Sequence, residues 1–520
     1  IKMGGAEKSN VFTKISLALF GQMSWDSIPY MPIEIIYFPK WFPFNIYKIS
    51  YWSRTVLIPL LIIMQRRPIA NNPNVVSIDE IFNKKDNKIS IELSNKDEKF
   101  FSNFFLFVDK ILRIFFPLVP KKYKNKCIEK AYDWILERLN GKDGLGGIFP
   151  AMVNSLISLN IDEKNRFSKE VKIVKKAINK LIIEKKNTAY CQPCVSPVWD
   201  SGWMGHVMLE NDNNVDKLVN WFLKKEIRTK GDWLEKKKFK PGGWAFQFNN
   251  SYYPDVDDTA LVGMFLDRCY KKNKSKKILD CIDRTRSWII GMQSSNGGWG
   301  AFDIDNNKQY LNSIPFADHG ALLDPPTVDV SARCISFLKQ LNRPEDVEVI
   351  KKGLNYILSN QEKDGSWFGR WGTNYIYGTW SSLCALNLLD FKNKSEVFKN
   401  AANFLKSSQR SDGGWGEDGI TYFKDSKNIS KESTPSQTAW AIMGLTAAGE
   451  IDSQEVEKGI KYLLKNKKDC DWEENYFTAV GFPKVFYLKY HGYAKYFPLL
   501  AILKIKNQLK LNSSTPQYGV

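Results

Sequence analysis

The chain has 520 residues, of which 43% are hydrophobic, enough for more than one domain with a full core and too many for a disordered protein. Its formal net charge of +19 indicates an anionic partner, but no known nucleic-acid-binding motif is present, which favours a lipid surface over nucleic acid. Aromatic residues make up 14% of the chain, more than core packing usually needs. We therefore expect aromatic rings to stack between repeats or to line a cavity.

Cysteine and histidine do not form a metal-binding pattern. Eight cysteines occur without a regular framework, and no secretory signal is recognised, which favours a reducing compartment. Cys191 and Cys194 form a CxxC motif, but no second CxxC and no thioredoxin-like context accompany it, so a zinc or redox role is not favoured. The histidines are His206, His319 and His491, none of them at a paired spacing. We expect no metal and no cofactor.

The N-terminal part has the pattern of packed structure from its first residues. It opens at Ile1 without an initiator Met, so we expect an upstream segment to be missing. An aromatic connector punctuated by prolines leads to a helix that begins near Ser53, whose apolar run is too short to span a bilayer. Residues 71–99 are polar and rich in turn formers, which predicts a surface excursion.

Residues 100–119 predict an amphipathic helix with a wide apolar face. On a helical wheel one face is rich in Phe, Ile and Leu, and the other, mostly polar side comprises Ser102, Asn103, Leu106, Asp109, Lys110 and Arg113. Such a helix is either buried between neighbours or inserted into a membrane surface. The Phe-rich face and the flanking lysines favour insertion. The helix cannot span the bilayer, because its polar stripe would then lie in hydrocarbon.

The stretch 252–260 holds three carboxylates within four positions, followed by an apolar helical segment. Pro254 ends the preceding loop, so Asp255, Asp257 and Asp258 fall on the first turn of a helix. Two ionised carboxylates about 5 Å apart repel by roughly 3 kcal/mol, so one of them should stay protonated and able to donate a proton. Helix capping, cation binding and acid catalysis all remain open on this motif alone.

An internal repeat follows, in which an aromatic residue, a Gln five positions later and a Trp six positions after that Gln recur. The copies that keep this spacing are Trp288, Gln293 and Trp299; Tyr356, Gln361 and Trp367; and Phe404, Gln409 and Trp415. Weaker copies lie around Trp134 and Tyr462. Gln can bond backbone groups left open at helix ends while Trp stacks on it, which predicts staples between helices. Helix pairs repeated in this way predict an all-α fold of two α/α barrels.

The DVDDTA motif together with these repeats resembles the squalene-hopene cyclase family of class II triterpene cyclases. Matching blocks run in the family's order from residues 10–13 through 196–200 to 481–483. The resemblance implies an incomplete second α/α barrel over 1–194, which carries the membrane-contacting helix, and a catalytic barrel over 195–520. It also implies an apolar cavity between the barrels, squalene as substrate, a homodimer, and a monotopic position on the cytoplasmic face of a bacterial inner membrane.

The resemblance further implies roles for single residues. Asp257 would protonate the terminal alkene of squalene, with Asp255 and Asp258 tuning it, and the matching supporting positions are Asp329, Arg370 and Tyr377. The positions that match the family's cavity wall are Trp52, Phe149, Trp199, Phe246, Phe302, Trp371, Phe482, Phe486, Tyr490 and Tyr493. Their ring faces would stabilise a moving positive charge by about 0.5–2 kcal/mol each. Without the resemblance, each of these aromatic residues would be interpreted as core.

Several positions depart from the best-described members of the family. Arg333 stands where those members carry a His beside the acid. Because Arg stays charged, it can stabilise the aspartate left after proton transfer but is not expected to shuttle the next proton. Phe302 stands where some members have Tyr, and Phe149 stands where some have Gln. The second of these changes leaves the ratio of alkene to alcohol product open.

Two other functions fit parts of the sequence. Tetraprenyl-curcumene and diterpene cyclases also use a DxDD acid, so another polyprenyl substrate remains an alternative, although the match over both barrels favours squalene. A helical-repeat scaffold would explain the Gln and Trp repeats. It would explain neither the acidic cluster nor the aromatic excess.

Overall fold

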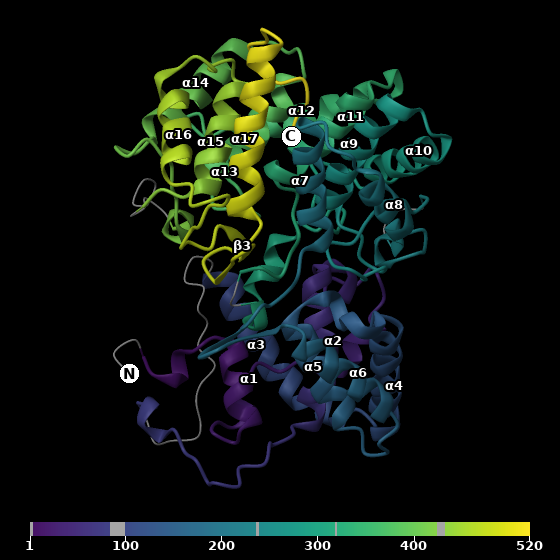
Figure 1. Cartoon of the computed structure of the whole chain (residues 1–520). Helices are drawn as coiled ribbons and strands as arrows, with labels where there is room; N and C mark the ends of the chain where they lie inside the picture. Colours follow the sequence, from purple (N-terminus) through teal and green to yellow (C-terminus); the bar gives the residue numbers. More distant parts are fainter. Residues whose placement is uncertain (1–3, 84–98, 236–238, 318–319, 424–431) are drawn as a thin grey trace. The chain divides into compact units, whose positions relative to one another are not determined.

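The computed structural model describes residues 4–83, 99–235, 239–317, 320–423 and 432–520. The chain divides into two compact units, unit 1 with Ile1–Val195 and Asn306–Asp324, and unit 2 with Ser196–Asp305 and Pro325–Val520 (Figure 1). The family resemblance implies one barrel over all of 195–520. Residues 306–324 pack with unit 1 instead, because their apolar side chains, including Leu311, Phe316 and Leu322, join a core of that unit.

Helices dominate both units, which confirms the predicted fold class. The helices and strands of unit 1 are α1 (Val11–Leu19), α2 (Tyr51–Arg66), α3 (Lys99–Phe115), α4 (Lys121–Glu137), α5 (Phe149–Asn160), α6 (Ser168–Asn179), β1 (Ile182–Lys185) and β2 (Thr188–Cys191). Those of unit 2 are α7 (Pro197–Glu210), α8 (Asp216–Lys225), α9 (Val256–Asn273), α10 (Lys276–Gly291), α11 (Val328–Leu341), α12 (Val347–Ser359), α13 (Tyr375–Asn387), α14 (Lys394–Ser407), α15 (Pro435–Ala447), α16 (Gln454–Lys465), β3 (Ala479–Phe482), β4 (Phe486–Leu488) and α17 (Tyr493–Lys510).

Two antiparallel hairpins, β1 with β2 and β3 with β4, are not predicted by the sequence analysis. In the first, Ile182 pairs with Cys191 and Lys185 with Thr188. In the second, the register shifts between Val480 and Phe482, which marks a bulge. Their strands are three or four residues long, too short for an alternation of polar and apolar residues to be recognised.

In the described part of unit 2, α7, α9, α11, α13, α15 and α17 form a closed ring, each helix packing on the next and α17 on α7. Outside this ring lie α8, α10, α12, α14 and α16, each packed against an inner helix. Every residue of α15 is buried, as expected for an inner helix that is covered on all sides. The arrangement is an α/α barrel.

The repeated Gln residues connect successive outer helices. Gln409, which follows α14, donates from Nε2 to the carbonyl of Gly413 in its own turn at 2.9 Å and to that of Glu455 in α16 at 2.8 Å. Gln361 makes the same bonds to Gly365 and Val397, and Gln293 to Gly297 and Val349. The repeats are therefore staples between helices, as predicted.

Each repeated Trp residue forms a hydrogen bond to the C-terminal end of the helix that precedes it. The indole N–H of Trp415 donates to the carbonyl of Leu405 near the end of α14, and Trp367 and Trp299 make the equivalent bonds. Trp472, in a weaker copy, donates to Leu463 in the same way. These bonds occupy carbonyl groups that a helix end leaves without an internal partner.

Unit 1 packs around α2. This helix contacts α4 and α5, and α5 contacts α6. Ile58, Leu61 and Ile62 of α2 join Trp134 of α4 in one core cluster. The N-terminal α1 packs into a second cluster, which also includes residues of 306–324. The weak copy of the repeat around Trp134 is therefore part of the core of unit 1.

Replacing Gln409 by Ala should destabilise unit 2 by about 1–3 kcal/mol, because two carbonyl groups lose a partly buried donor. Hydrogen exchange should also become faster in the first turn of α16. Denaturant unfolding and hydrogen exchange read by mass spectrometry measure both effects. Lys467→Ala is the matched control, because Lys467 takes the place of the Gln in a weaker copy and is exposed. Equal stability of the two variants would contradict the staple.

Candidate active site

The first turn of α9 carries the three carboxylates of the DVDDTA motif. Asp255 is the N-cap residue, and its Oδ1 accepts the N–H groups of Asp257 at 2.8 Å and Asp258 at 3.1 Å. Its own N–H donates to the carbonyl of Trp244 at 2.7 Å. Asp255 therefore caps the helix, and the side chains of Asp257 and Asp258 are left for other contacts.

Asp257 is bound on both carboxylate oxygens by the guanidinium of Arg333. Nε of Arg333 donates to Oδ1, and Nη2 donates to Oδ2 at 3.2 Å. The same Nη2 donates to the hydroxyl of Tyr377 at 2.8 Å. Asp257 is 6% exposed and Arg333 is 3% exposed. Consecutive helices of the ring, α9, α11 and α13, thus meet at one buried ion pair and its hydrogen bond to Tyr377.

Aromatic rings surround the guanidinium of Arg333. Its central carbon lies 5.2 Å from the ring centre of Trp199, 5.6 Å from Trp203, 5.7 Å from Tyr377 and 5.8 Å from Trp380. Each ring can stabilise a buried cation by about 0.5–2 kcal/mol when its face is presented. These contacts offset part of the cost of burying Arg333 and limit how far it can move.

Burial and the ion pair with Arg333 together make Asp257 an acid of intermediate strength. Burial raises the pKa of Asp257, the charge and hydrogen bonds of Arg333 lower it, and the charge of Asp329 raises it again, so the carboxyl has a pKa of about 6. Burial works to lower the pKa of Arg333, but Asp257 and Tyr377 raise it above its ordinary value. Arg333 is therefore a permanent cation, while Asp257 can exist in either form near neutral pH.

Asp258 has a different environment from its neighbour. It is 1% exposed, and its Oδ1 has no hydrogen-bond partner among the described residues. Burial raises the pKa of Asp258 well above its ordinary value, and the charges of Asp255, Asp257 and Asp200 raise it further, against a lowering by Arg333. The two adjacent acids of the motif are therefore not equivalent.

Asp329 fixes a loop beside the pair. Its Oδ2 accepts the backbone N–H of Arg370 at 3.0 Å and that of Trp371 at 2.8 Å. The guanidinium of Arg370 lies over the ring of Trp371, 4.2 Å from its centre. The family resemblance implies that Arg370 supports the acid. In the structure its guanidinium lies on Trp371, and its backbone N–H donates to Asp329.

Most of the aromatic residues assigned to a cavity wall contact one another in unit 2. The indole N–H of Trp199 donates to the hydroxyl of Tyr493 at 3.0 Å. The remaining ring pairs, with distances between ring centres, are Tyr490 with Tyr493 at 5.3 Å, Phe246 with Tyr490 at 5.8 Å, Phe302 with Trp371 at 6.5 Å, and Phe482 with Phe486 at 5.0 Å. Trp52 and Phe149 belong to unit 1, where Trp52 donates to the carbonyl of Ala321.

Three residues of this site are absent from the sequence analysis. Trp203 and Trp380 face the guanidinium of Arg333. Helical spacing could have indicated both, because Trp203 lies four positions after Trp199 and Trp380 lies three positions after Tyr377. Asp200, near Asp258, accepts hydrogen bonds from Ser196 at 2.7 Å and Tyr496 at 3.0 Å. No local pattern indicates that contact with Tyr496, which lies in α17.

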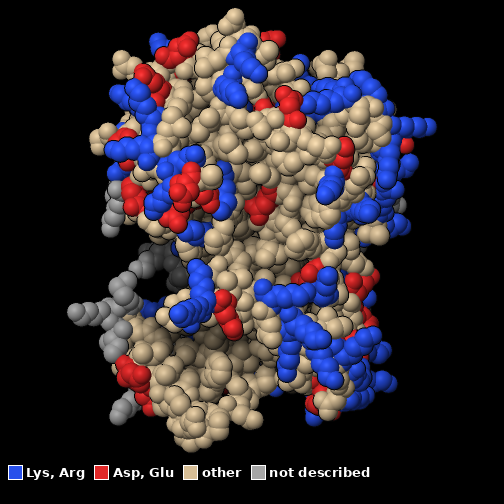
Figure 2. Space-filling view, viewed as in Figure 1, with Lys and Arg blue, Asp and Glu red and all other residues tan. Residues whose placement is uncertain are grey.

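Other features of the chain do not add to this site. Cys191 is exposed and Cys194 is buried. His319 lies outside the described residues, and within them no group of His, Cys, Asp or Glu is placed to hold a metal ion. On the face shown in Figure 2, Lys and Arg side chains occur in several groups among Asp and Glu.

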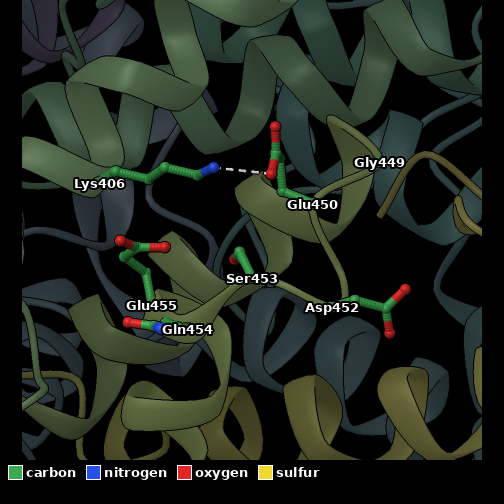
Figure 3. A pocket seen from close by; sticks show the side chains of 7 residues that line it. All are labelled: Lys406, Gly449, Glu450, Asp452, Ser453, Gln454 and Glu455. Atoms are coloured by element: carbon green, nitrogen blue, oxygen red, sulfur yellow. Dashed lines mark hydrogen bonds and ion pairs between the residues drawn. The ribbon is translucent and has the colours of Figure 1, made fainter.

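A polar pocket on unit 2 also lies apart from the acid. Figure 3 shows Lys406 and Glu450 facing each other across it, joined by an ion pair of 2.7 Å. The other lining residues are Gly449, Asp452, Ser453, Gln454 and Glu455. The pocket shares no residue with the site around Asp257. Its charged lining suits no apolar ligand.

Known proteins match this chain over nearly its whole length. Residues 195–507 match the family model described as the squalene-hopene cyclase C-terminal domain, and residues 1–187 match that of the N-terminal domain. The squalene-hopene cyclase of Zymomonas mobilis is 45% identical over 533 aligned residues, which cover 99% of this chain and 80% of the relative. Those of Bradyrhizobium diazoefficiens and Alicyclobacillus acidocaldarius are 46% and 38% identical, covering 99% and 98% of this chain and 80% and 81% of the relatives.

The carboxyl of Asp257 should titrate near pH 6 in infrared difference spectra, and this signal should disappear in Asp257→Asn. Arg333→Gln should move the titration to higher pH, because removing a nearby cation makes a carboxyl harder to ionise. Arg370→Gln is the matched control, since its guanidinium lies on Trp371. An unchanged titration in Arg333→Gln would mean that the ion pair does not set the acidity.

Proposed function

The chain belongs to the squalene-hopene cyclase family, and on that premise we propose that it protonates squalene and cyclises it to hopene or to the hydrated product hopanol. The observation that carries the proposal is the buried pair of Asp257 and Arg333 inside a box of aromatic rings. Squalene has no polar group, so the reaction must begin with a proton placed directly on a carbon–carbon double bond.

Asp257 meets the two requirements of such an acid. It must be neutral before the transfer, which its pKa of about 6 permits, and its anion must be stabilised afterwards, which the fixed guanidinium of Arg333 provides. The O–H bond of Asp257 breaks and a C–H bond forms at the terminal alkene, leaving a carbocation. Successive double bonds then supply electron pairs for new C–C bonds. Loss of a proton at the end gives hopene, and capture of water with loss of a proton gives hopanol.

The remaining site residues act on the acid or on the cation. Tyr377 holds Arg333, Asp255 and Asp258 set the charge around Asp257, and Asp329 fixes the loop that presents Trp371. Arg370 acts through its stack on Trp371. The residues we assign to the substrate are Trp52, Phe149, Trp199, Phe246, Phe302, Trp371, Phe482, Phe486, Tyr490 and Tyr493. Ring faces can stabilise the migrating charge without forming a bond to it.

We also propose that α3 attaches the protein to a membrane surface. Part of its polar stripe faces unit 1: Asp109 pairs with Arg113 at 2.6 Å and accepts the backbone N–H of Tyr30. Several of its apolar side chains face outward, including Phe107, Ile114 and Phe115, each 60% or more exposed, whereas Phe105 is buried. An amphipathic helix turned this way would cost free energy in water and gain it in a lipid interface.

The membrane contact we propose is peripheral. Within the described residues, no helix is both long enough and apolar enough to cross a bilayer. The lysines that follow α3, such as Lys121, Lys122 and Lys126, are exposed and can each contribute about 1 kcal/mol of attraction to anionic lipid. We further propose that this membrane surface is the cytoplasmic face of a bacterial inner membrane and that the protein is a homodimer. Both proposals are supported by the family resemblance.

Asp257→Asn should lower squalene turnover by about 10²–10⁴-fold or more, because Asn keeps the shape of the side chain but has no acidic proton. Turnover is measured in detergent, with hopene and hopanol quantified by mass spectrometry. Asp267→Asn is the matched control: Asp267 is a buried acid of the same helix, and it pairs with Lys271 away from the site. Near-parent turnover in Asp257→Asn with unchanged thermal unfolding would remove Asp257 from the role of acid.

Replacing Phe107, Ile114 and Phe115 together by Ser should release the protein from vesicles that contain anionic lipid, because the exposed apolar face of α3 is lost. Flotation of protein with vesicles measures the bound fraction. A control variant replaces Val347, Leu464 and Leu509 of unit 2 by Ser. These side chains are 58%, 58% and 59% exposed, and this variant should still bind the vesicles. If both variants float like the parent, α3 is not the anchor.

A further inference from the structure

The buried site holds two adjacent carboxyl groups with different partners. Asp257 has a guanidinium on both of its oxygens. Asp258 is 1% exposed, and its Oδ1 has no hydrogen-bond partner among the described residues. Burying an ionised carboxylate with one oxygen left without a partner costs several kcal/mol, whereas burying a neutral carboxyl costs far less. With one proton to share between the two groups, the proton therefore resides on Asp258 and the negative charge on Asp257.

The charges around Asp258 act in the same direction. Asp255 and Asp257 lie on the cap and first turn of the same helix, Asp200 faces Asp258 from α7, and Arg333 faces it from α11. Three of these four groups are acids, and together they favour the neutral form of Asp258. The guanidinium acts against them, but its hydrogen bonds are directed to Asp257.

Asp200 is placed at the level of the first turn of α9 by close helix packing. A Cβ added at Gly202 of α7 would lie 2.7 Å from Cδ2 of Leu261, and one added at Gly205 would lie 2.9 Å from the ring of Phe265. The helices run side by side in the same direction at this spacing, so position 200 lies beside the acids. Hydrogen bonds from Ser196 and Tyr496 hold the carboxylate of Asp200 in place.

Each cyclisation removes the proton of Asp257, and the residue bound to it cannot supply another. A guanidinium does not give up a proton under physiological conditions, and burial raises the pKa of Tyr377 above its ordinary value, so its hydroxyl also keeps its proton. The proton released from the cyclised product leaves at a different point of the substrate. The acid must therefore be reloaded from a neighbouring group or directly from water.

We propose that Asp258 stores a proton and passes it to Asp257 after each cyclisation, with Asp200 holding Asp258 in its neutral form. The inference rests on the proposed function, in which Asp257 is the acid. In the transfer, the O–H bond of Asp258 breaks and the O–H bond of Asp257 forms. Asp258 then takes up one proton from water, which balances the proton lost by the product cation. Asp258 thus supplies the proton that Arg333, the other group beside Asp257, cannot give.

The position of the proton can be read without substrate. Infrared difference spectra at about pH 7.5, above the pKa of Asp257, should show a protonated carboxyl in the parent and in Asp257→Asn. This signal should be lost in Asp258→Asn. The opposite pattern, with the signal lost in Asp257→Asn and kept in Asp258→Asn, would overturn the proposal. A parent chain that does not cyclise squalene would refute the proposed function, while the spectra would still locate the proton.

The pH dependence of turnover tests the transfer itself. In Asp258→Asn, Asp257 can be loaded only from water, so activity should fall about tenfold per pH unit above about pH 6 and be partly retained at pH 5. The parent should keep its activity to higher pH. Parallel profiles, or an Asp258→Asn variant that folds but is inactive at every pH, would overturn the proposal.

A second variant keeps the test decisive if Asp258→Asn does not fold. Asp200→Asn removes one of the anions that face Asp258, which lowers the pKa of Asp258 and should end the active range of the enzyme at a lower pH than in the parent. Thermal unfolding monitors the fold of both variants. An Asp200→Asn profile that coincides with that of the parent would show that Asp200 does not hold Asp258 in its neutral form.

Discussion

The burial of one carboxylate with one permanent cation is the constraint on which unit 2 is built. Removing both charges from water is costly, and a pair of this kind seldom adds to stability. The protein offsets the cost with two hydrogen bonds between Arg333 and Asp257, a third to Tyr377, and four aromatic rings around the guanidinium. Such an arrangement is best explained by function, because an apolar core would be simpler to fold.

The closed ring of helices makes this burial possible. Asp257, Arg333 and Tyr377 come from consecutive inner helices, so a shift of one helix along its axis would break the pair. The outer helices resist such shifts through the bonds of the repeated Gln and Trp residues, which use backbone carbonyl groups and leave the inner helices free to carry polar side chains. The staples and the acid therefore depend on each other, although they lie on different layers of the barrel.

In α3 of unit 1, part of the polar stripe faces the protein and several apolar side chains face outward, the reverse of an ordinary surface helix. The ion pair of Asp109 and Arg113 packs inward, and most of the Phe-rich face is exposed, with Phe105 buried. The wheel of residues 100–119 indicates both faces from the sequence, but it cannot tell which one contacts the rest of the protein. The structure decides this through backbone groups of Ile28 and Tyr30, which bind the polar stripe.

The sequence by itself determined the fold class, the staples and the position of the acidic cluster at a helix start, and through the family resemblance it predicted that Arg333 stands where other members carry a His. These features follow from spacing along the chain, which sets what lies on one turn or one face of a helix. Only the tertiary structure decided which acid caps the helix, which one pairs with Arg333 and which one keeps an oxygen without a partner among the described residues. It also placed Arg370 on Trp371, Asp200 beside Asp258 and residues 306–324 in unit 1. Those contacts join segments far apart in the sequence, and the charge state of a buried acid depends on all the groups that meet around it.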